Sequence, residues 1–187
     1  MPRPAFTRLV TVLSVAVAVL LWPAVARPQA AVAPKPAAPS AGAAAAVPAD
    51  AQWHDVTTWG VEGRGWGDQE RKKWFDRFPA KAEGRVTDDV WNLSRDAAGM
   101  VARFKTDARE IYARYTLSKP QLGMPHMPAT GVSGLDLYAR DDQGGWKWVM
   151  GTKPTQQTVE AIVVGGLAAG TREYAAYLPL FNGVESL

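Results

Sequence analysis

Apolar and polar residues alternate along much of the chain after residue 100, with the period of two that is typical of half-buried β-strands. In residues 110–117 one face is polar and the other is apolar, the apolar face being Ile111, Ala113, Tyr115 and Leu117. The same alternation predicts strands over 100–105, 135–140, 145–150 and 172–178. Turn-forming residues at 141–145 join two of these runs, so we expect a β-hairpin over 135–150.

The remaining patterns that indicate secondary structure cover shorter segments. Asn182-Gly183 follows the apolar run 177–181 and predicts a second hairpin, whose returning strand is 184–187. Asp68 is a candidate N-cap for a short helix that ends before Pro79, and Asp88-Asp89 predicts the start of a short turn or helix. We interpret 161–167, which runs into two glycines, as a strand end or a loop. Many short strands and few helices predict an all-β fold, an antiparallel sandwich or barrel.

The first 50 residues have a different character. Residues 1–26 combine two arginines, an apolar run and Ala24-Val25-Ala26, which is the layout of a cleavable signal peptide. An uncleaved membrane anchor is the alternative, but the apolar run is short for a span of roughly 20 residues. Residues 27–50 are rich in alanine and proline and predict a disordered linker. We therefore expect one structured domain, 51–187, in a secreted or periplasmic protein with no stable membrane span after cleavage.

Composition and charge exclude several kinds of chemistry. The 187 residues include no cysteine, so disulfides, thiolate zinc sites and cysteine nucleophiles are excluded. The two histidines, His54 and His126, cannot form a three-histidine metal site, and we expect neither a metal nor a cofactor. Loss of Arg3 and Arg8 with the leader lowers the net charge from +3 to +1. That charge gives no electrostatic reason to expect a nucleic-acid partner.

Candidate catalytic residues are few. Ser133, His126 and Asp136 suggest a small serine hydrolase, but Leu135 stands where the Gly-x-Ser-x-Gly elbow needs its last glycine, and a strand follows instead of a helix. We keep that hydrolase only as a hypothesis to be tested and assign no catalytic residue. Residues 60–67 carry four glycines without the rest of a phosphate-binding motif, and predict a loop with several positive φ angles. Trp66 lies in this loop, and Trp59 directly precedes it. Each indole either stacks on a sugar or covers the core.

Several stretches taken together resemble a known family, namely 90–94, 98–108, 124–127, 130–138 and 177–184. Their order and spacing are similar to those of the N-terminal accessory domain found upstream of SGNH-hydrolase-type esterases. That domain is named for a Gly-x-Asp-Leu-Tyr motif, which the run from Gly134 to Tyr138 matches. The resemblance covers residues 53–187 and implies a jelly-roll-like β-sandwich.

The resemblance also implies a downstream SGNH catalytic domain as partner. The family's catalytic blocks, Gly-Asp-Ser and Asp-x-x-His, do not occur in this sequence, so no catalytic role carries over. We therefore expect the front part of a longer esterase that acts on acylated carbohydrate; the alternative is a stand-alone carbohydrate- or cell-wall-binding module. The candidates for ligand binding or domain docking are Trp59, Trp66, His126, Asp136 and Tyr138.

Overall fold

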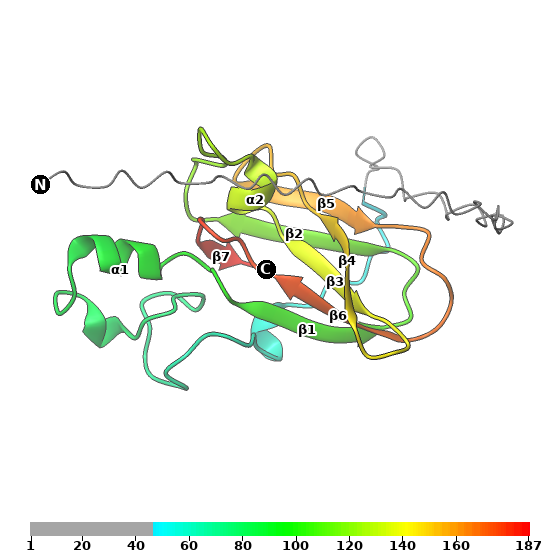
Figure 1. Ribbon diagram of the computed structural model, residues 1–187, viewed down its shortest axis with the longest axis horizontal. Helices are drawn as coiled ribbons and strands as arrows, with labels where there is room; N and C mark the ends of the chain where they lie inside the picture. The colour runs from blue at the N-terminus through cyan, green and yellow to red at the C-terminus, as the bar shows by residue number, and fades with distance from the viewer. Residues whose placement is uncertain (1–46) are drawn as a thin grey trace, which may run out of the picture. The chain divides into compact units, whose positions relative to one another are not determined.

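The computed structural model describes residues 47–187; the predicted signal peptide and nearly all of the predicted linker lie outside the described residues. Within this part, the strands form two antiparallel sheets (Figure 1). The four-stranded sheet contains, in spatial order, β1 (Val101–Thr106), β6 (Arg172–Tyr177), β3 (Asp136–Arg140) and β4 (Trp146–Gly151). The three-stranded sheet contains, again in spatial order, β5 (Thr158–Val164), β2 (Ile111–Leu117) and β7 (Val184–Ser186). The all-β prediction is confirmed.

The alternating pattern determines which side chains lie between the sheets. In β2 the side chains of Ala113, Tyr115 and Leu117 are buried, as predicted for that face. Leu137 of β3 and Tyr174 of β6 meet them from the four-stranded sheet. Full burial of one large apolar side chain contributes roughly 1.5–3 kcal/mol, so these contacts between the two sheets stabilise the sandwich.

One polar contact lies inside this apolar core. The Tyr115 hydroxyl and the Thr152 Oγ1 are 2.7 Å apart, and the same Oγ1 accepts a hydrogen bond from the Leu135 amide at 2.8 Å. Burial raises the pKa of Tyr115 to about 12. The contact joins three segments, namely β2, the start of β3 and the residue that follows β4, and so links the two sheets at this point.

The helices are short and lie beside the sheets. They are the 3₁₀ turns η1 (Val56–Thr58) and η2 (Ala80–Ala82) and the α-helices α1 (Asp88–Ser94) and α2 (Ala129–Ser133). The helix start predicted at Asp88-Asp89 is confirmed by α1. The helix predicted from Asp68 to Arg77 is wrong, because that segment consists of bends and turns. Its polar groups make other contacts instead: the Asp76 carboxylate accepts from the Lys73 amide of the same segment at 2.9 Å and from Arg95 Nε at 2.8 Å.

The predicted C-terminal hairpin is also wrong. β6 ends at Tyr177, and β7 pairs with β2 in the other sheet. A type I′ turn needs positive φ at both central residues, and neither Asn182 nor Gly183 has a positive φ. The segment interpreted as a strand end or loop at 161–167 is in part the second half of β5, which begins three residues earlier and ends at Val164.

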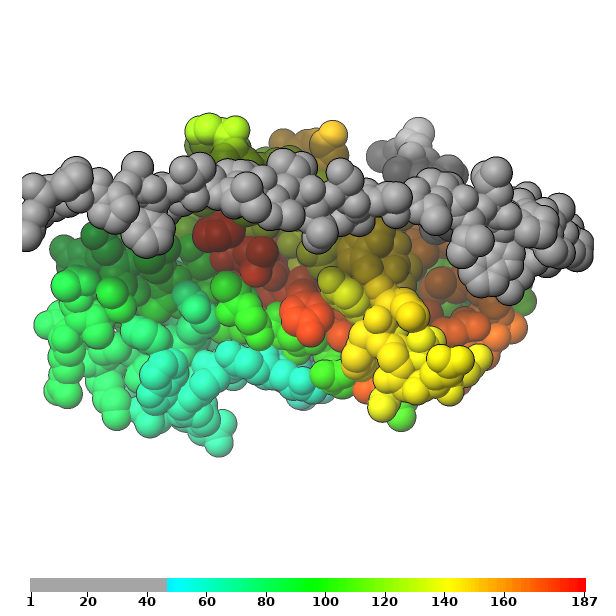
Figure 2. All heavy atoms as spheres, viewed as in Figure 1, coloured from blue at the N-terminus to red at the C-terminus, as the bar shows by residue number. Residues whose placement is uncertain are grey.

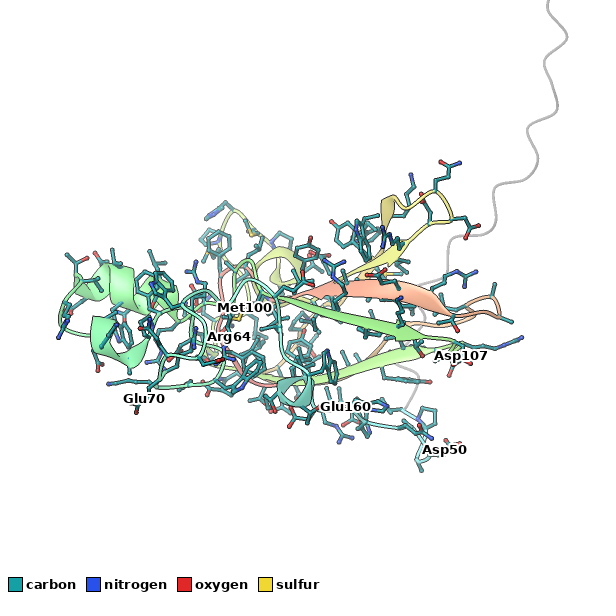
Figure 3. All side chains as sticks on the ribbon, turned by 90° about the horizontal axis from the view of Figure 1, so that it is seen from below. Asp50, Arg64, Glu70, Met100, Asp107 and Glu160 are labelled. Carbon is teal, nitrogen blue, oxygen red and sulfur yellow. The ribbon has the colours of Figure 1, made fainter. Side chains whose placement is uncertain are left out.

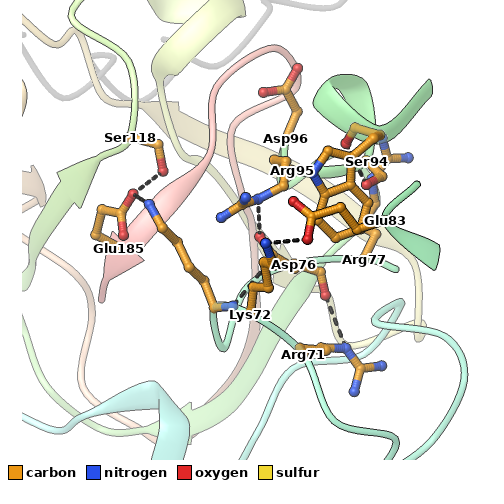
Figure 4. A network of polar contacts seen from close by, with 12 residues as sticks. Arg71, Lys72, Asp76, Arg77, Glu83, Ser94, Arg95, Asp96, Ser118 and Glu185 are labelled. Atoms are coloured by element: carbon orange, nitrogen blue, oxygen red, sulfur yellow. Dashed lines mark hydrogen bonds and ion pairs between the residues drawn. The ribbon is translucent and has the colours of Figure 1, made fainter. Parts of the chain in front are cut away.

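A polar network joins the α1 lobe, residues 63–95, to the sandwich (Figure 4). Lys73 of the lobe pairs with Glu185 of β7, and the Ser118 hydroxyl donates to the same carboxylate at 2.5 Å. In Figure 3, Glu70 lies in this lobe and Asp107 at the far end of the sandwich, with Met100 between them. Among residues 47–187, no helix has the length and apolar character needed to cross a membrane.

Candidate functional site

The Gly-x-Asp-Leu-Tyr motif covers the turn into β3 and most of that strand. Gly134 lies so close to its neighbours that an added Cβ would be 2.4 Å from the carbonyl oxygens of both Thr130 and Thr152. Leu135 and Leu137 point into the core. This inward half of the motif, Gly134, Leu135 and Leu137, therefore serves the packing of the sandwich.

The other two motif residues lie on the outer face of the four-stranded sheet. The Asp136 Oδ1 accepts a hydrogen bond from the indole Nε1 of Trp148 at 3.0 Å. Gly151 stands opposite Asp136 in the register, and a Cβ there would be 2.9 Å from the same oxygen. Tyr138 of β3 lies opposite Trp148 of β4 in the strand register. The Tyr138 ring meets the Tyr177 ring edge-on, with ring centres 5.4 Å apart.

These side chains form an aromatic face, which we define as Tyr138, Trp146, Trp148 and Tyr177. Two of these large rings are exposed to an unusual degree: Trp148 is 56% exposed and Tyr177 is 44% exposed. Beside the rings is a hollow of about 370 Å³, lined chiefly by Asp136, Tyr138, Trp146, Tyr177, Leu178 and Leu180. In Figure 2 the yellow atoms of the β3–β4 hairpin and the orange atoms near the end of β6 gather on the same side of the molecule.

Ion pairs border the aromatic face. Arg103 of β1 donates to both carboxylate oxygens of Glu62, at 2.7 and 2.9 Å, and Arg140 donates to Glu173 at 3.0 Å. The hydrogen bond from Arg103 lowers the pKa of Glu62, and that from Arg140 lowers the pKa of Glu173. The Arg103 guanidinium also lies 4.8 Å from the centre of the Trp146 ring, so it helps to hold this ring over the sheet.

The three other predicted candidates do not line this hollow. Trp59 is 45% exposed and follows η1, where its amide donates to the Val56 carbonyl. His126 is exposed in a turn closed by the bridge between Met124 and Met127. Trp66 is in the α1 lobe, where its ring meets that of Phe78 edge-on at 4.8 Å. The structure thus brings Asp136 and Tyr138 together and leaves Trp59, Trp66 and His126 elsewhere.

The glycine-rich segment is the predicted loop. Gly60, Gly63, Gly65 and Gly67 all have positive φ, as expected for that segment. Gly63 is required by close packing as well, because a Cβ there would be 2.1 Å from the Gly99 carbonyl oxygen.

The geometry gives the serine-hydrolase hypothesis no support. Ser133 is fully buried, and its Oγ accepts a hydrogen bond from Asn182 Nδ2 at 3.1 Å. A substrate therefore has no access to that hydroxyl, and Asp136 is bonded to Trp148 instead of a histidine. Over residues 47–187, no group of three or more His, Cys, Asp and Glu side chains is placed to hold a metal ion.

Sequence reasoning missed three of the four rings of the aromatic face. Trp146 and Trp148 lie in a strand that was predicted, and their spacing of two already places them on one face. The hairpin register then puts Trp148 opposite Tyr138. Tyr177 joins them because β6 pairs with β3, a pairing between strands that are distant in the sequence.

An outer sheet face with large exposed rings, on a two-sheet antiparallel sandwich, defines an all-β domain with a surface suited to binding. The family described as GxDLY, the N-terminus of esterases of the SGNH-hydrolase type, matches residues 51–187. The chain belongs to this family, as the resemblance predicted.

A solved structure is similar as well. It is the 1.40 Å crystal structure of a Bacteroides ovatus protein described as a GDSL-like lipase, with 25% sequence identity and a TM-score of 0.57. The match covers 61% of this chain and 33% of that one, so this chain corresponds to about a third of that protein. No curated protein matches the chain.

Proposed function

We propose that this chain is the non-catalytic N-terminal domain of a secreted or periplasmic SGNH-type esterase that removes acyl groups from carbohydrate. The family supports the position of the domain in such an enzyme, and the similar Bacteroides protein, described as a GDSL-like lipase, has a long remainder outside the match. The leader predicted in residues 1–26 supports export. A jelly-roll-like topology fits the placement of the late strand β6 between β1 and β3.

We infer that the aromatic face docks the SGNH catalytic domain. The observation that carries this inference is the cluster of exposed rings around Asp136 and Tyr138, with Leu180 beside them at 49% exposure. Exposed patches of this kind mark interaction sites, and tyrosine, tryptophan and arginine are enriched in protein interfaces. The ion pairs of Arg103 and Arg140 supply the polar rim that such interfaces have.

A stand-alone carbohydrate- or cell-wall-binding module is the second candidate. The hollow beside the aromatic face favours it, since its 370 Å³ lies in the range of small-molecule sites. Aromatic rings offer flat apolar surfaces for a sugar ring, and the Asp136 carboxylate offers an acceptor for its hydroxyls.

The two functions separate in a binding experiment on the full chain. In one arm the chain is titrated calorimetrically with an SGNH catalytic domain taken from a member of the family. In the other arm it is titrated with acetylated xylo-oligosaccharides. Each arm is repeated with Trp148→Ala, which removes a ring of the aromatic face, and with Trp59→Ala, which removes a similarly exposed ring elsewhere.

We expect the catalytic domain to bind, and Trp148→Ala to weaken that binding about tenfold or more, as for a central interface aromatic. Trp59→Ala should leave it unchanged. If Trp148→Ala abolished oligosaccharide binding and the catalytic domain showed no measurable binding, the docking role would be wrong and the carbohydrate-binding module would take its place. We also expect no hydrolysis of acetylated chromogenic substrates by the chain alone; turnover that Ser133→Ala abolishes would overturn the non-catalytic role.

A further inference from the structure

A second hollow lies in the α1 lobe, away from the aromatic face. It has a volume of about 340 Å³ and is lined chiefly by Trp66, Phe78, Pro79, Lys81, Ala82 and Arg85. Trp66 is 52% exposed, and its edge-on contact with Phe78 leaves much of the indole open to solvent. The hollow thus combines a large aromatic surface with two long cationic side chains.

The loop that presents Trp66 has an unusual backbone. Gly65, Trp66 and Gly67 are consecutive residues with positive φ, at 66°, 45° and 53°. Trp66 is the only residue other than glycine with a positive φ in 47–187, a conformation that bulky side chains rarely adopt. Glycine would adopt this conformation at lower energetic cost than tryptophan, and backbone strain of this kind is often found at functional sites.

One arginine holds this loop in place. The Arg71 guanidinium donates hydrogen bonds to five backbone carbonyls: those of Arg64, Gly65, Gly67, Gln69 and Asp76. Four of these carbonyls belong to the segment 64–69 around Trp66. The indole is therefore presented by a rigid loop, and a rigid loop loses less conformational entropy when a ligand binds.

The two charged side chains that line the hollow, Lys81 and Arg85, are both cationic. None of the residues that line it is acidic. Lys81 and Arg85 form no ion pair within residues 47–187, whereas the nearby Glu83 is paired with Lys72. Unpaired cations beside an exposed ring are suited to a ligand that has both an apolar ring face and an anionic group.

We propose that this hollow binds a carboxylated saccharide, a sugar unit of the uronic-acid class. The indole of Trp66 packs on the ring face of the sugar, and Lys81 and Arg85 hold its carboxylate. The site is separate from the aromatic face and does not depend on the docking role. In an exported esterase it would select acidic polysaccharide.

Calorimetric titration of the full chain with trigalacturonate tests the proposal, with the neutral methyl ester of the same trisaccharide as matched ligand. Trp66→Gly removes the ring and suits a φ of 45°, so the loop is retained. Arg85→Ala removes one cation, and Arg109→Ala is the control for loss of an exposed arginine elsewhere. Circular dichroism melting checks that each variant is folded.

We expect saturable binding of the acid that weakens as salt is added. Trp66→Gly should weaken it about tenfold, Arg85→Ala by a similar factor, and Arg109→Ala not at all. Equal affinity for the acid and its neutral ester, no saturable binding, or unchanged affinity in both Trp66→Gly and Arg85→Ala would each overturn the proposal. Each of these results leaves the docking of the catalytic domain to be judged by its own experiment.

Discussion

Asn182 is expected to be one of the most sensitive polar positions in the chain. It is fully buried, and its side chain joins two connections at one end of the sandwich. The Nδ2 donates to the Lys119 carbonyl and to the Ser133 Oγ, both at 3.1 Å, and the Oδ1 accepts from the Lys119 amide at 2.9 Å. Replacement by alanine removes all three hydrogen bonds and leaves their partners without a donor or acceptor.

The expected loss follows from these contacts. Each of the three hydrogen bonds contributes about 1 kcal/mol net, so Asn182→Ala should lower the free energy of unfolding by about 3 kcal/mol. With a urea dependence of about 2 kcal/mol per molar, the unfolding midpoint moves down by about 1.5 M. The backbone carbonyl of Asn182 accepts from the Ala97 amide at 3.0 Å, a bond that the substitution does not remove.

Urea unfolding followed by tryptophan fluorescence measures the shift. Asn92→Ala is the matched control, because Asn92 is exposed on α1, and it should change stability by no more than about 0.5 kcal/mol. If Asn182→Ala changed the midpoint as little as Asn92→Ala, the buried hydrogen bonds would not stabilise the fold as argued.

Two further predictions concern the motif and the core. Gly134→Ala should destabilise the chain by several kcal/mol, since its Cβ would be 2.4 Å from two carbonyl oxygens; a thermal melt close to that of the parent would contradict this packing. Tyr115, with its pKa raised to about 12, should make stability depend on alkaline pH. The unfolded chain releases the phenol proton near pH 10, so stability is full below pH 10 and falls between pH 10 and 12, by at most about 1.4 kcal/mol per pH unit. Tyr115→Phe should reduce this slope in urea unfolding series at pH 9 to 11, and equal slopes would refute the assignment.

Local alternation predicted the strands that matter most for the core. β2 and β3 were found because apolar and polar positions alternate along each, and the alternation alone places Ala113 and Tyr115 inside. β4 was found as the strand that returns after the turn at 141–145. β5 was found only in part, because its apolar second half runs directly into Gly165-Gly166, which suggested a loop. The pairing of distant strands leaves no local pattern, so Tyr177 could not be placed beside Tyr138 from sequence.

The wrong predictions share one physical cause. Asp68 and the Asn182-Gly183 pair are good local patterns for a helix cap and a hairpin turn, but long-range contacts decide both segments. Asn182 is drawn into the interior by Lys119 and Ser133, and a Cβ on Gly183 would be 2.6 Å from the Arg95 carbonyl oxygen. Packing therefore requires Asn182 and Gly183 at these positions, and the two residues do not form a hairpin turn.

The two halves of the motif make different contacts, and the difference bears on the docking proposal. Gly134, Leu135 and Leu137 are explained by contacts within the sandwich, but Asp136 and Tyr138 face outward among rings that are open to solvent. Their mutual contacts are largely exposed and contribute little to folding stability, since exposed interactions are weak. The outward half therefore holds Trp148 and Tyr177 in place on the surface, an arrangement that supports the proposed docking of a catalytic domain on this face.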